Sequence, residues 1–87
     1  MRALVRIFLD ELPERVRMLE SAWSAGDAQR ISSLAHQLKG AGAGYGYESL
    51  TSAAAALEGA LDDAGRGLDA AHEEFVTLID LCRRAVL

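Results

Sequence analysis

The spacing of apolar residues is the feature that most limits what this chain can fold into. Between residues 12 and 23 the apolar side chains recur at intervals of four, three and four, at Leu12, Val16, Leu19 and Trp23. This spacing matches the period of an amphipathic α-helix, and the sequence has no alternating run of the kind that is typical of a half-buried strand. We therefore expect an all-α fold.

Pro13 and Gly26 divide the N-terminal third of the chain. Proline is tolerated in the first turn of a helix and disrupts later turns, so residues 1–12 are predicted to form a short helix, separate or kinked against the next one. Gly26 is predicted to end the helix that follows, because glycine readily adopts the conformation of a C-terminal cap. The apolar residues of the first segment are Leu4, Ile7 and Phe8.

Three further helices are expected after Gly26. Asp27 is a candidate N-cap for the first of them. The second begins at about Glu48 and stops at Gly65 and Gly67, and the third occupies the C-terminal part of the chain. Their apolar stripes are, in order, Ala28, Ile31, Leu34, Ala35 and Leu38; Leu50, Ala53, Ala54, Leu57 and Leu61; and Leu68, Ala71, Phe75, Leu78, Ile79 and Cys82.

The predicted connections are short and the sequence has no internal repeat. The economical assembly is an antiparallel up-down four-helix bundle with a short additional N-terminal helix. No linker long enough to divide the chain is present, so residues 1–87 are expected to form a single helical domain.

The composition narrows the classes of partner. With 51% hydrophobic residues and a formal net charge of −4, the 87 residues suffice for one modest core. No run approaches the roughly 18 apolar residues of a membrane span, no leader is evident, and the lone Cys82 has no disulfide partner, which favours a cytoplasmic protein. The acidic balance argues against nucleic acid. We expect a monomer whose partner is a protein or a small molecule.

His36 is predicted to face away from the core. An α-helix turns about 100° per residue, so Ile31, Leu34 and Leu38 fall roughly 140° to 160° away from His36. Small and polar residues share its face within about 60°, namely Gln29, Ser32, Ser33, Lys39, Gly40 and Ala43. A solvated surface histidine is the simpler interpretation of His36, whereas the residues that follow it in the sequence favour a functional histidine.

Four glycines on alternate positions follow His36 in a predicted helix. A glycine inside a helix costs about 1 kcal/mol relative to alanine, so Gly40 requires an explanation. Helical side chains lean toward the N-terminus, and the absence of one at Gly40 leaves the His36 ring open to a large partner. Lys39 is a flexible cation one turn from His36 and suits an anion such as a phosphoryl group. Gly44 and Gly46 are expected to end the helix and turn the chain.

The stretch HQLKGAGAGYG on a predicted helix, followed by SLTSAAAALE, resembles the histidine-containing phosphotransfer (HPt) domain of multistep two-component phosphorelays. The lead-in FLDELPERVRMLESAWSAGD is also similar to the first helix and turn of that family, so the resemblance covers nearly the whole chain. One departure is that Gly42 and Gly44 replace the Ser or Ala residues more common there. The residues that meet the family pattern are His36, Leu38, Lys39, Gly40, Gly46, Leu57 and Glu58.

The resemblance implies a phosphocarrier in a signalling relay, without an ATP site or turnover of its own. His36 would accept a phosphoryl group from the aspartate of a response-regulator receiver domain, or from a sensor or hybrid histidine kinase, and a second receiver would remove it. Lys39 would pair with the phosphate, and Gly40 would give the partner access. The resemblance implies no cofactor and no metal on this chain, since Mg²⁺ would belong to the receiver.

For several other residues the sequence leaves two interpretations open. Glu58 could reach the second ring nitrogen of His36 and fix its tautomer, or be a solvated residue. Tyr45 and Tyr47 are expected to pack the loop, with a receiver contact as the alternative. His72 has no lysine or glycine neighbour and is expected to be structural or simply exposed.

Two other function classes compete with a phosphocarrier. A nucleotide-binding loop is suggested by KGAGAGYG, but the lysine precedes the glycines and no strand leads into the segment. A helical-bundle docking module for a receiver or kinase, with His36 never phosphorylated, remains open. An acid-labile phosphate on His36 separates this module from a carrier.

Overall fold

The computed structural model describes residues 2–62 and 68–85, and their side chains from residue 6 onward. Within these ranges the chain is helical and contains no strand, which confirms the expected all-α class. The elements are α1 (Arg2–Ser24), α2 (Ala28–Tyr45), α3 (Glu48–Leu61), a short 3-10 helix η1 (Leu68–Ala71) and α4 (His72–Ala85).

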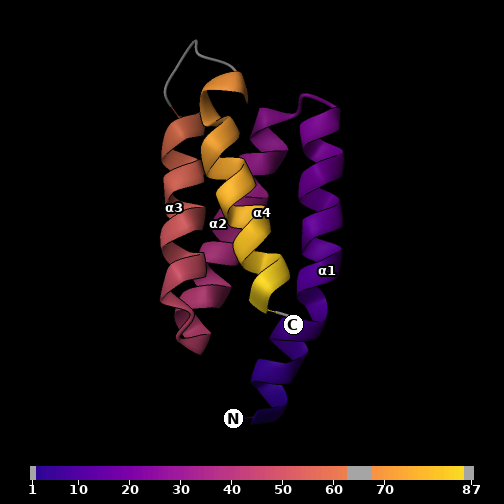
Figure 1. The fold of residues 1–87 in the computed structure, drawn as a ribbon, viewed down its shortest axis with the longest axis vertical. Helices are drawn as coiled ribbons and strands as arrows, with labels where there is room; N and C mark the ends of the chain where they lie inside the picture. Colours follow the sequence, from indigo (N-terminus) through magenta and orange to yellow (C-terminus); the bar gives the residue numbers. More distant parts are fainter. Residues whose placement is uncertain (1, 63–67, 86–87) are drawn as a thin grey trace.

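The four α-helices pack as a bundle in which each helix has two main neighbours. Helix α2 packs against α1 and α3, and α4 packs against the other sides of α3 and α1. In Figure 1 the chain runs upward in α1, downward in α2, upward in α3 and downward in α4. Helices α2 and α3 therefore lie side by side along their length, and this pair carries the residues singled out above.

The N-terminal segment is not the separate short helix that was one of the two predictions for it, and corresponds to the other, a lead-in kinked against the next helix. Residues on both sides of Pro13 belong to the one helix α1, whose N-terminal part leans away from the rest of the helix in Figure 1. A proline inside a helix costs about 3 kcal/mol, because it removes one hydrogen bond and crowds the preceding turn. Here Phe8 and Leu12 before the proline and Val16 after it are all buried, so packing of one continuous stripe offsets that cost.

The core draws residues from all four helices. No polar or charged side chain among the described residues is buried in it. Two predicted apolar positions are not part of it, because Ile7 is 52% exposed and Ala28 is exposed, while the side chain of Leu4 lies outside the described ones. The largest fully buried side chains are Leu12, Leu19, Ile31, Leu38, Leu57, Leu78 and Cys82.

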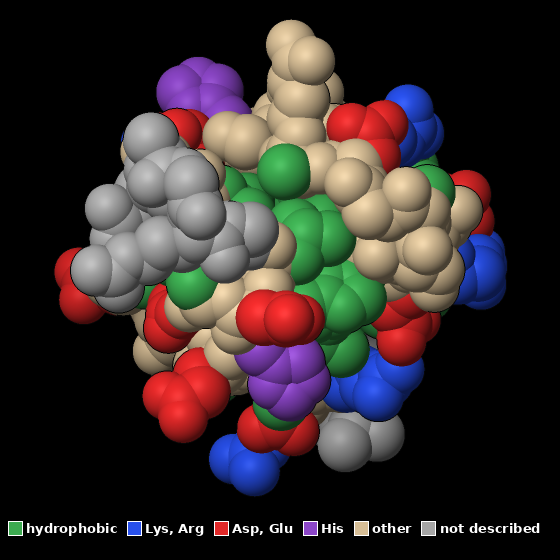
Figure 2. All heavy atoms as spheres, turned by 90° about the horizontal axis from the view of Figure 1, so that it is seen from above, with side chains coloured by type: hydrophobic (Ala, Val, Ile, Leu, Met, Phe, Trp, Pro, Cys, Tyr) green, Lys and Arg blue, Asp and Glu red, His purple; other side chains and the backbone are tan. Residues whose placement is uncertain are grey.

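An aromatic stack closes the end of the bundle at which α1 ends and α4 begins. The rings of Trp23 and Phe75 stack with centroids 4.3 Å apart, and the ring of the exposed His72 lies 6.0 Å from Trp23. Figure 2 looks onto this end and shows hydrophobic side chains at its centre, with charged groups around the margin. Trp23 is therefore partly buried against the core, as expected, and His72 is a surface residue.

The two predicted capping residues, Asp27 and Gly46, cap the ends of α2. The Asp27 side chain accepts a hydrogen bond from the backbone N–H of Arg30 at 3.1 Å. Gly46 has a φ of 80° and caps the C-terminal end in the left-handed conformation. Gly44 was expected to help end the helix and instead lies within it. Gly65 and Gly67, the predicted end of the next helix, lie outside the described residues.

Gly42 allows α2 and α3 to approach closely. A Cβ atom at Gly42 would lie 2.8 Å from Oγ1 of Thr51 on α3, which is shorter than a van der Waals contact. The same threonine hydroxyl donates a hydrogen bond of 3.4 Å to the backbone carbonyl of Lys39 on α2. The small side chains of Ala53 and Ala54 on α3 are buried as well. This close packing sets the position of α3 residues relative to His36.

Candidate functional site

His36 stands on the outer face of α2. Its side chain is 70% exposed, whereas its neighbour Ala35 and the nearby Leu38 are buried in the core. The structure therefore agrees with the direction that the helical spacing predicts for His36.

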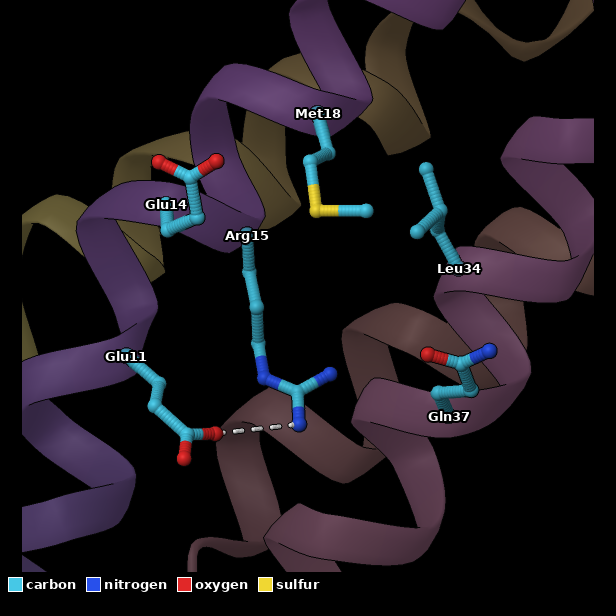
Figure 3. A pocket seen from close by; sticks show the side chains of 6 residues that line it. All are labelled: Glu11, Glu14, Arg15, Met18, Leu34 and Gln37. Carbon is cyan, nitrogen blue, oxygen red and sulfur yellow. Dashed lines mark ion pairs between the residues drawn. The ribbon is translucent and has the colours of Figure 1, made fainter.

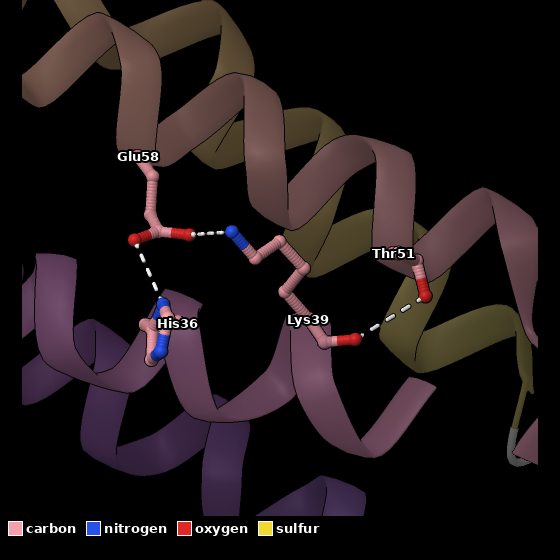
Figure 4. Close-up of polar contacts among 4 residues, drawn as sticks. All are labelled: His36, Lys39, Thr51 and Glu58. Carbon is pink, nitrogen blue, oxygen red and sulfur yellow. Dashed lines mark hydrogen bonds and ion pairs between the residues drawn. The ribbon is translucent and has the colours of Figure 1, made fainter. Parts of the chain in front are cut away.

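The Glu58 side chain of α3 contacts the edge of the His36 imidazole. Its Oε2 atom is 3.2 Å from Nδ1 of His36 (Figure 4). Leu57, the residue before it, is fully buried and anchors this part of α3 in the core, and the Glu58 side chain is only 19% exposed. The contact between Glu58 and a ring nitrogen, one of the two interpretations from the sequence, is present in the structure.

Lys39 contacts the same carboxylate. Its Nζ atom forms an ion pair of 3.0 Å with Oε1 of Glu58, so the two carboxylate oxygens serve two different residues of α2 (Figure 4). The contact with the Lys39 ammonium is the main cause that lowers the pKa of Glu58 from its ordinary value of 4.5, and the nearby His36 adds to it, while partial burial opposes it.

The ion pair between Lys39 and Glu58 was not predicted from the sequence. One signal for it was available, since Lys39 lies about 60° from His36 on the same helix face and a carboxylate that reaches the histidine also comes near the lysine. The hydrogen bond from Thr51 to the Lys39 backbone was missed too, because it depends on how far α3 is shifted along α2.

Gly40 lies beside this cluster on the exposed surface of α2. A Cβ atom built on it would have no neighbour within 4 Å, so the packing of the bundle does not require a glycine at this position. Gly42 is the opposite case, because its Cβ would overlap Thr51. The two glycines therefore differ in what they do for the fold.

His36 lines one hollow, and its neighbour Gln37 also lines a second. One, of about 370 Å³, is lined by Ser32, Ser33, His36, Gln37 and Glu58. The other, of about 270 Å³, lies between α1 and α2, as Figure 3 shows. Its lining residues are Glu11, Glu14, Arg15, Met18, Leu34 and Gln37. Gln37 borders both hollows, so the surface around His36 continues toward α1.

The two tyrosines near the end of α2 pack against α1. The ring centroids of Tyr45 and Tyr47 lie 5.1 and 5.3 Å from that of Phe8. This agrees with the expected packing role, although Tyr45 keeps an exposed fraction of 36%.

Neither a metal site nor a membrane span is found in the part of the chain that the structure describes. Over residues 2–62 and 68–85, no three His, Cys, Asp or Glu side chains form a group that could hold a metal ion. Over the same ranges, no helix combines the length and the apolar character needed to cross a membrane.

Comparison with models of protein families identifies the family of the chain. The family model of the Hpt domain matches residues 3–86, nearly the whole chain. Comparison with curated proteins and with solved structures gave no match. Hpt domains are helical bundles that act in histidine phosphotransfer of two-component phosphorelays, as carriers rather than enzymes. Together with the exposed His36, the neighbouring Lys39 and the helical bundle described above, this match shows that the chain belongs to the Hpt domain family.

Proposed function

We propose that this chain is a phosphocarrier that exchanges a phosphoryl group between Nε2 of His36 and the aspartate of a receiver domain. The observation that carries the proposal is the 3.2 Å contact between Glu58 Oε2 and Nδ1 of His36. A carboxylate accepts hydrogen bonds, so this contact favours the neutral tautomer that carries its proton on Nδ1. Nε2 then keeps its lone pair and lies on the side of the ring away from Glu58 (Figure 4).

The transfer step needs little from the carrier beyond this arrangement. The lone pair of Nε2 forms a bond to phosphorus while the bond from phosphorus to the aspartate oxygen breaks, and its electron pair stays on the aspartate carboxylate. The ring retains its Nδ1 proton and gains positive charge, which the Glu58 carboxylate stabilises from the other side. Because phosphoryl transfer has a loose transition state, positioning and charge account for most of the catalysis.

Lys39 and Gly40 are proposed to serve the phosphoryl group and the partner. The ammonium of Lys39 is one turn from His36 and supplies positive charge for the phosphate. Because Gly40 has no side chain, a partner can approach the His36 ring from that side. The absence of any neighbour within 4 Å of a Cβ built at Gly40 supports this role. The two hollows that Gln37 borders offer the partner a surface that reaches from His36 toward α1.

The partners proposed for this phosphocarrier are receiver domains and a sensor or hybrid histidine kinase. The reacting aspartate and its Mg²⁺ belong to the receiver in this account. We further propose that residues 1–87 act as one domain and as a monomer, with no nucleotide site of their own.

Incubation with a panel of phosphorylated receivers tests the proposal. A carrier acquires a phosphate that is labile in acid and stable in alkali, as expected for a phosphohistidine, and the receiver loses its label at the same rate. A receiver that binds the chain tightly and transfers nothing would instead indicate the docking module. His36→Gln is the matched variant, because it removes the nucleophile and keeps an exposed polar side chain.

A further inference from the structure

A single carboxylate holds both reactive side chains of α2. Glu58 Oε2 contacts Nδ1 of His36 at 3.2 Å, and Oε1 contacts Nζ of Lys39 at 3.0 Å. The Glu58 side chain is 19% exposed and the lysine side chain 37% exposed, so the carboxylate is the better fixed of the two partners. In the unphosphorylated chain the Lys39 ammonium is therefore engaged on the Glu58 side of the imidazole.

A phosphoryl group on His36 would lie on the other side of the ring. Figure 4 shows Nδ1 directed toward Glu58 and Nε2 directed away from it, with the end of Lys39 at the carboxylate. Lys39 has a four-carbon stem with free rotation, so its ammonium can move between the two sides. The ammonium is a compact charge and pairs closely with one anion at a time.

The charges change when His36 is phosphorylated. Before the transfer, the ammonium of Lys39 and the carboxylate of Glu58 balance each other. Afterwards a phosphoryl group with a charge near −2 is attached to Nε2, on the side of the ring opposite the Glu58 carboxylate. The lysine then has two anions to choose from, and the more highly charged one is new.

We propose that Glu58 and the phosphoryl group on His36 compete for the ammonium of Lys39, so that the ion pair between Lys39 and Glu58 opens when the chain is phosphorylated. This inference rests on the proposed function, since it assumes that His36 carries the phosphate. The lowered pKa of Glu58 is consistent with it, because the carboxylate is charged at neutral pH and holds the lysine.

Competition of this kind limits how strongly the chain holds a phosphoryl group. Part of the attraction between Lys39 and the phosphate is offset by the loss of the ion pair with Glu58. A carrier must release what it accepts, and this offset weakens the phosphorylated state without removing the lysine that assists transfer. Glu58 would thus adjust the equilibrium of the relay in addition to orienting His36.

A double-mutant cycle measures the competition. The parent, Lys39→Gln, Glu58→Gln and the double variant are each brought to equilibrium with a receiver that exchanges phosphate with the parent, and the phosphorylated fraction is recorded. Glutamine at position 58 keeps an oxygen for Nδ1 of His36 and replaces the oxygen that faces Lys39 with an uncharged NH2 group, which removes the ion pair. Arg84→Gln is the control for net charge, because Arg84 pairs with Asp80 on α4.

The cycle has a definite expected result. Lys39→Gln should lower the phosphorylation equilibrium constant more in the Glu58→Gln background than in the parent, by a further factor of about two to five, the range that exposed ion pairs contribute. An equal loss in both backgrounds would mean that Lys39 contacts both anions at once. A smaller loss without Glu58 would mean that Glu58 positions Lys39 for the phosphate. Either result overturns the proposal.

Chemical phosphorylation gives a readout that needs no receiver. With phosphoramidate, the bond between Nε2 and phosphorus forms as the phosphorus–nitrogen bond of the donor breaks and ammonia leaves. Nuclear Overhauser contacts between the Lys39 Hε and Glu58 Hγ protons should be present before the reaction and lost after it, and their persistence contradicts the competition. If phosphoramidate labels His36 while no receiver does, the proposed function fails and this measurement still decides the competition.

Discussion

Glu58 contacts the imidazole of His36 although 22 positions separate the two residues in the sequence. The contact exists because α2 and α3 pack closely along their length, at Gly42 and Thr51 and at the buried alanines of α3. The carboxylate is held by a buried neighbour, Leu57, while the imidazole remains 70% exposed. The ring therefore has a fixed acceptor at Nδ1, and in the proposed function this leaves Nε2 as the nitrogen that reacts.

Replacing Glu58 tests its role in orienting His36. Glu58→Ala removes the acceptor for Nδ1 and should slow phosphoryl transfer by about fivefold, which corresponds to one hydrogen bond of about 1 kcal/mol. Glu58→Gln keeps an acceptor oxygen and should preserve the tautomer. The ¹⁵N chemical shifts of the His36 ring report which nitrogen carries the proton. A parent ring with the proton on Nε2 would rule out the assigned tautomer.

Gly40→Ala should separate stability from transfer. Alanine is the better helix former by about 1 kcal/mol, and the added Cβ meets nothing within 4 Å, so the melting temperature should rise by about 4–8 °C. Transfer should slow, because the methyl group stands beside the ring where the partner approaches.

Gly44→Ala is the matched control for this substitution. Gly44 is also in α2, exposed, and without a neighbour for a Cβ, but it lies one turn further from His36. It should stabilise the fold and leave transfer unchanged. If both alanine variants transfer at the parent rate, the open surface at Gly40 has no part in docking.

Gly42→Ala should act through packing. Its Cβ would lie 2.8 Å from Oγ1 of Thr51 and 3.4 Å from a backbone oxygen of Tyr47, so the helices or the threonine must shift. Overpacking of this kind costs about 1–3 kcal/mol, which more than cancels the gain in helix propensity. Thermal melting should show a loss for Gly42→Ala and partial recovery when Thr51→Ala is added. A gain equal to that of Gly40→Ala would contradict the close approach.

The stability of the unphosphorylated chain should depend on Glu58 at acid pH. The pKa of Glu58 is lower in the folded chain than its ordinary value of 4.5, so its contribution is present above pH 4.5 and is lost as the pH falls through the folded value. Urea unfolding between pH 7 and pH 3 should therefore show a smaller loss for Glu58→Gln than for the parent. Lys39→Ala should reduce the loss as well, since Lys39 is the main cause of the shift. Parallel curves for all three would show that the ion pair does not contribute.

The features of the site that depend on one helix could be predicted from the sequence. The direction of His36, the cap at Asp27 and the turn at Gly46 follow from helical spacing and from local conformational preferences. The ion pair of Lys39 with Glu58 could not be predicted in the same way, because it depends on the shift of α3 along α2.

The separate short helix expected before Pro13, as one of two alternatives, shows where local preference misleads. The penalty for proline is real, but the buried stripe that includes Phe8, Leu12 and Val16 crosses it and keeps α1 in one piece. Tertiary packing therefore decided the structure at this position. The apolar stripe is visible in the sequence, but its spacing does not say whether its burial outweighs the proline penalty.

The most direct test of the central claim is the location of the phosphate after transfer. A labelled receiver is incubated with the parent, His36→Gln and His72→Gln, and each chain is digested at alkaline pH so that phosphohistidine survives. His72 is the matched control because it is the other histidine and is also exposed. The account predicts label on the His36 peptide of the parent and of His72→Gln, and none on His36→Gln. Label on any other residue, or undiminished labelling of His36→Gln, would contradict it.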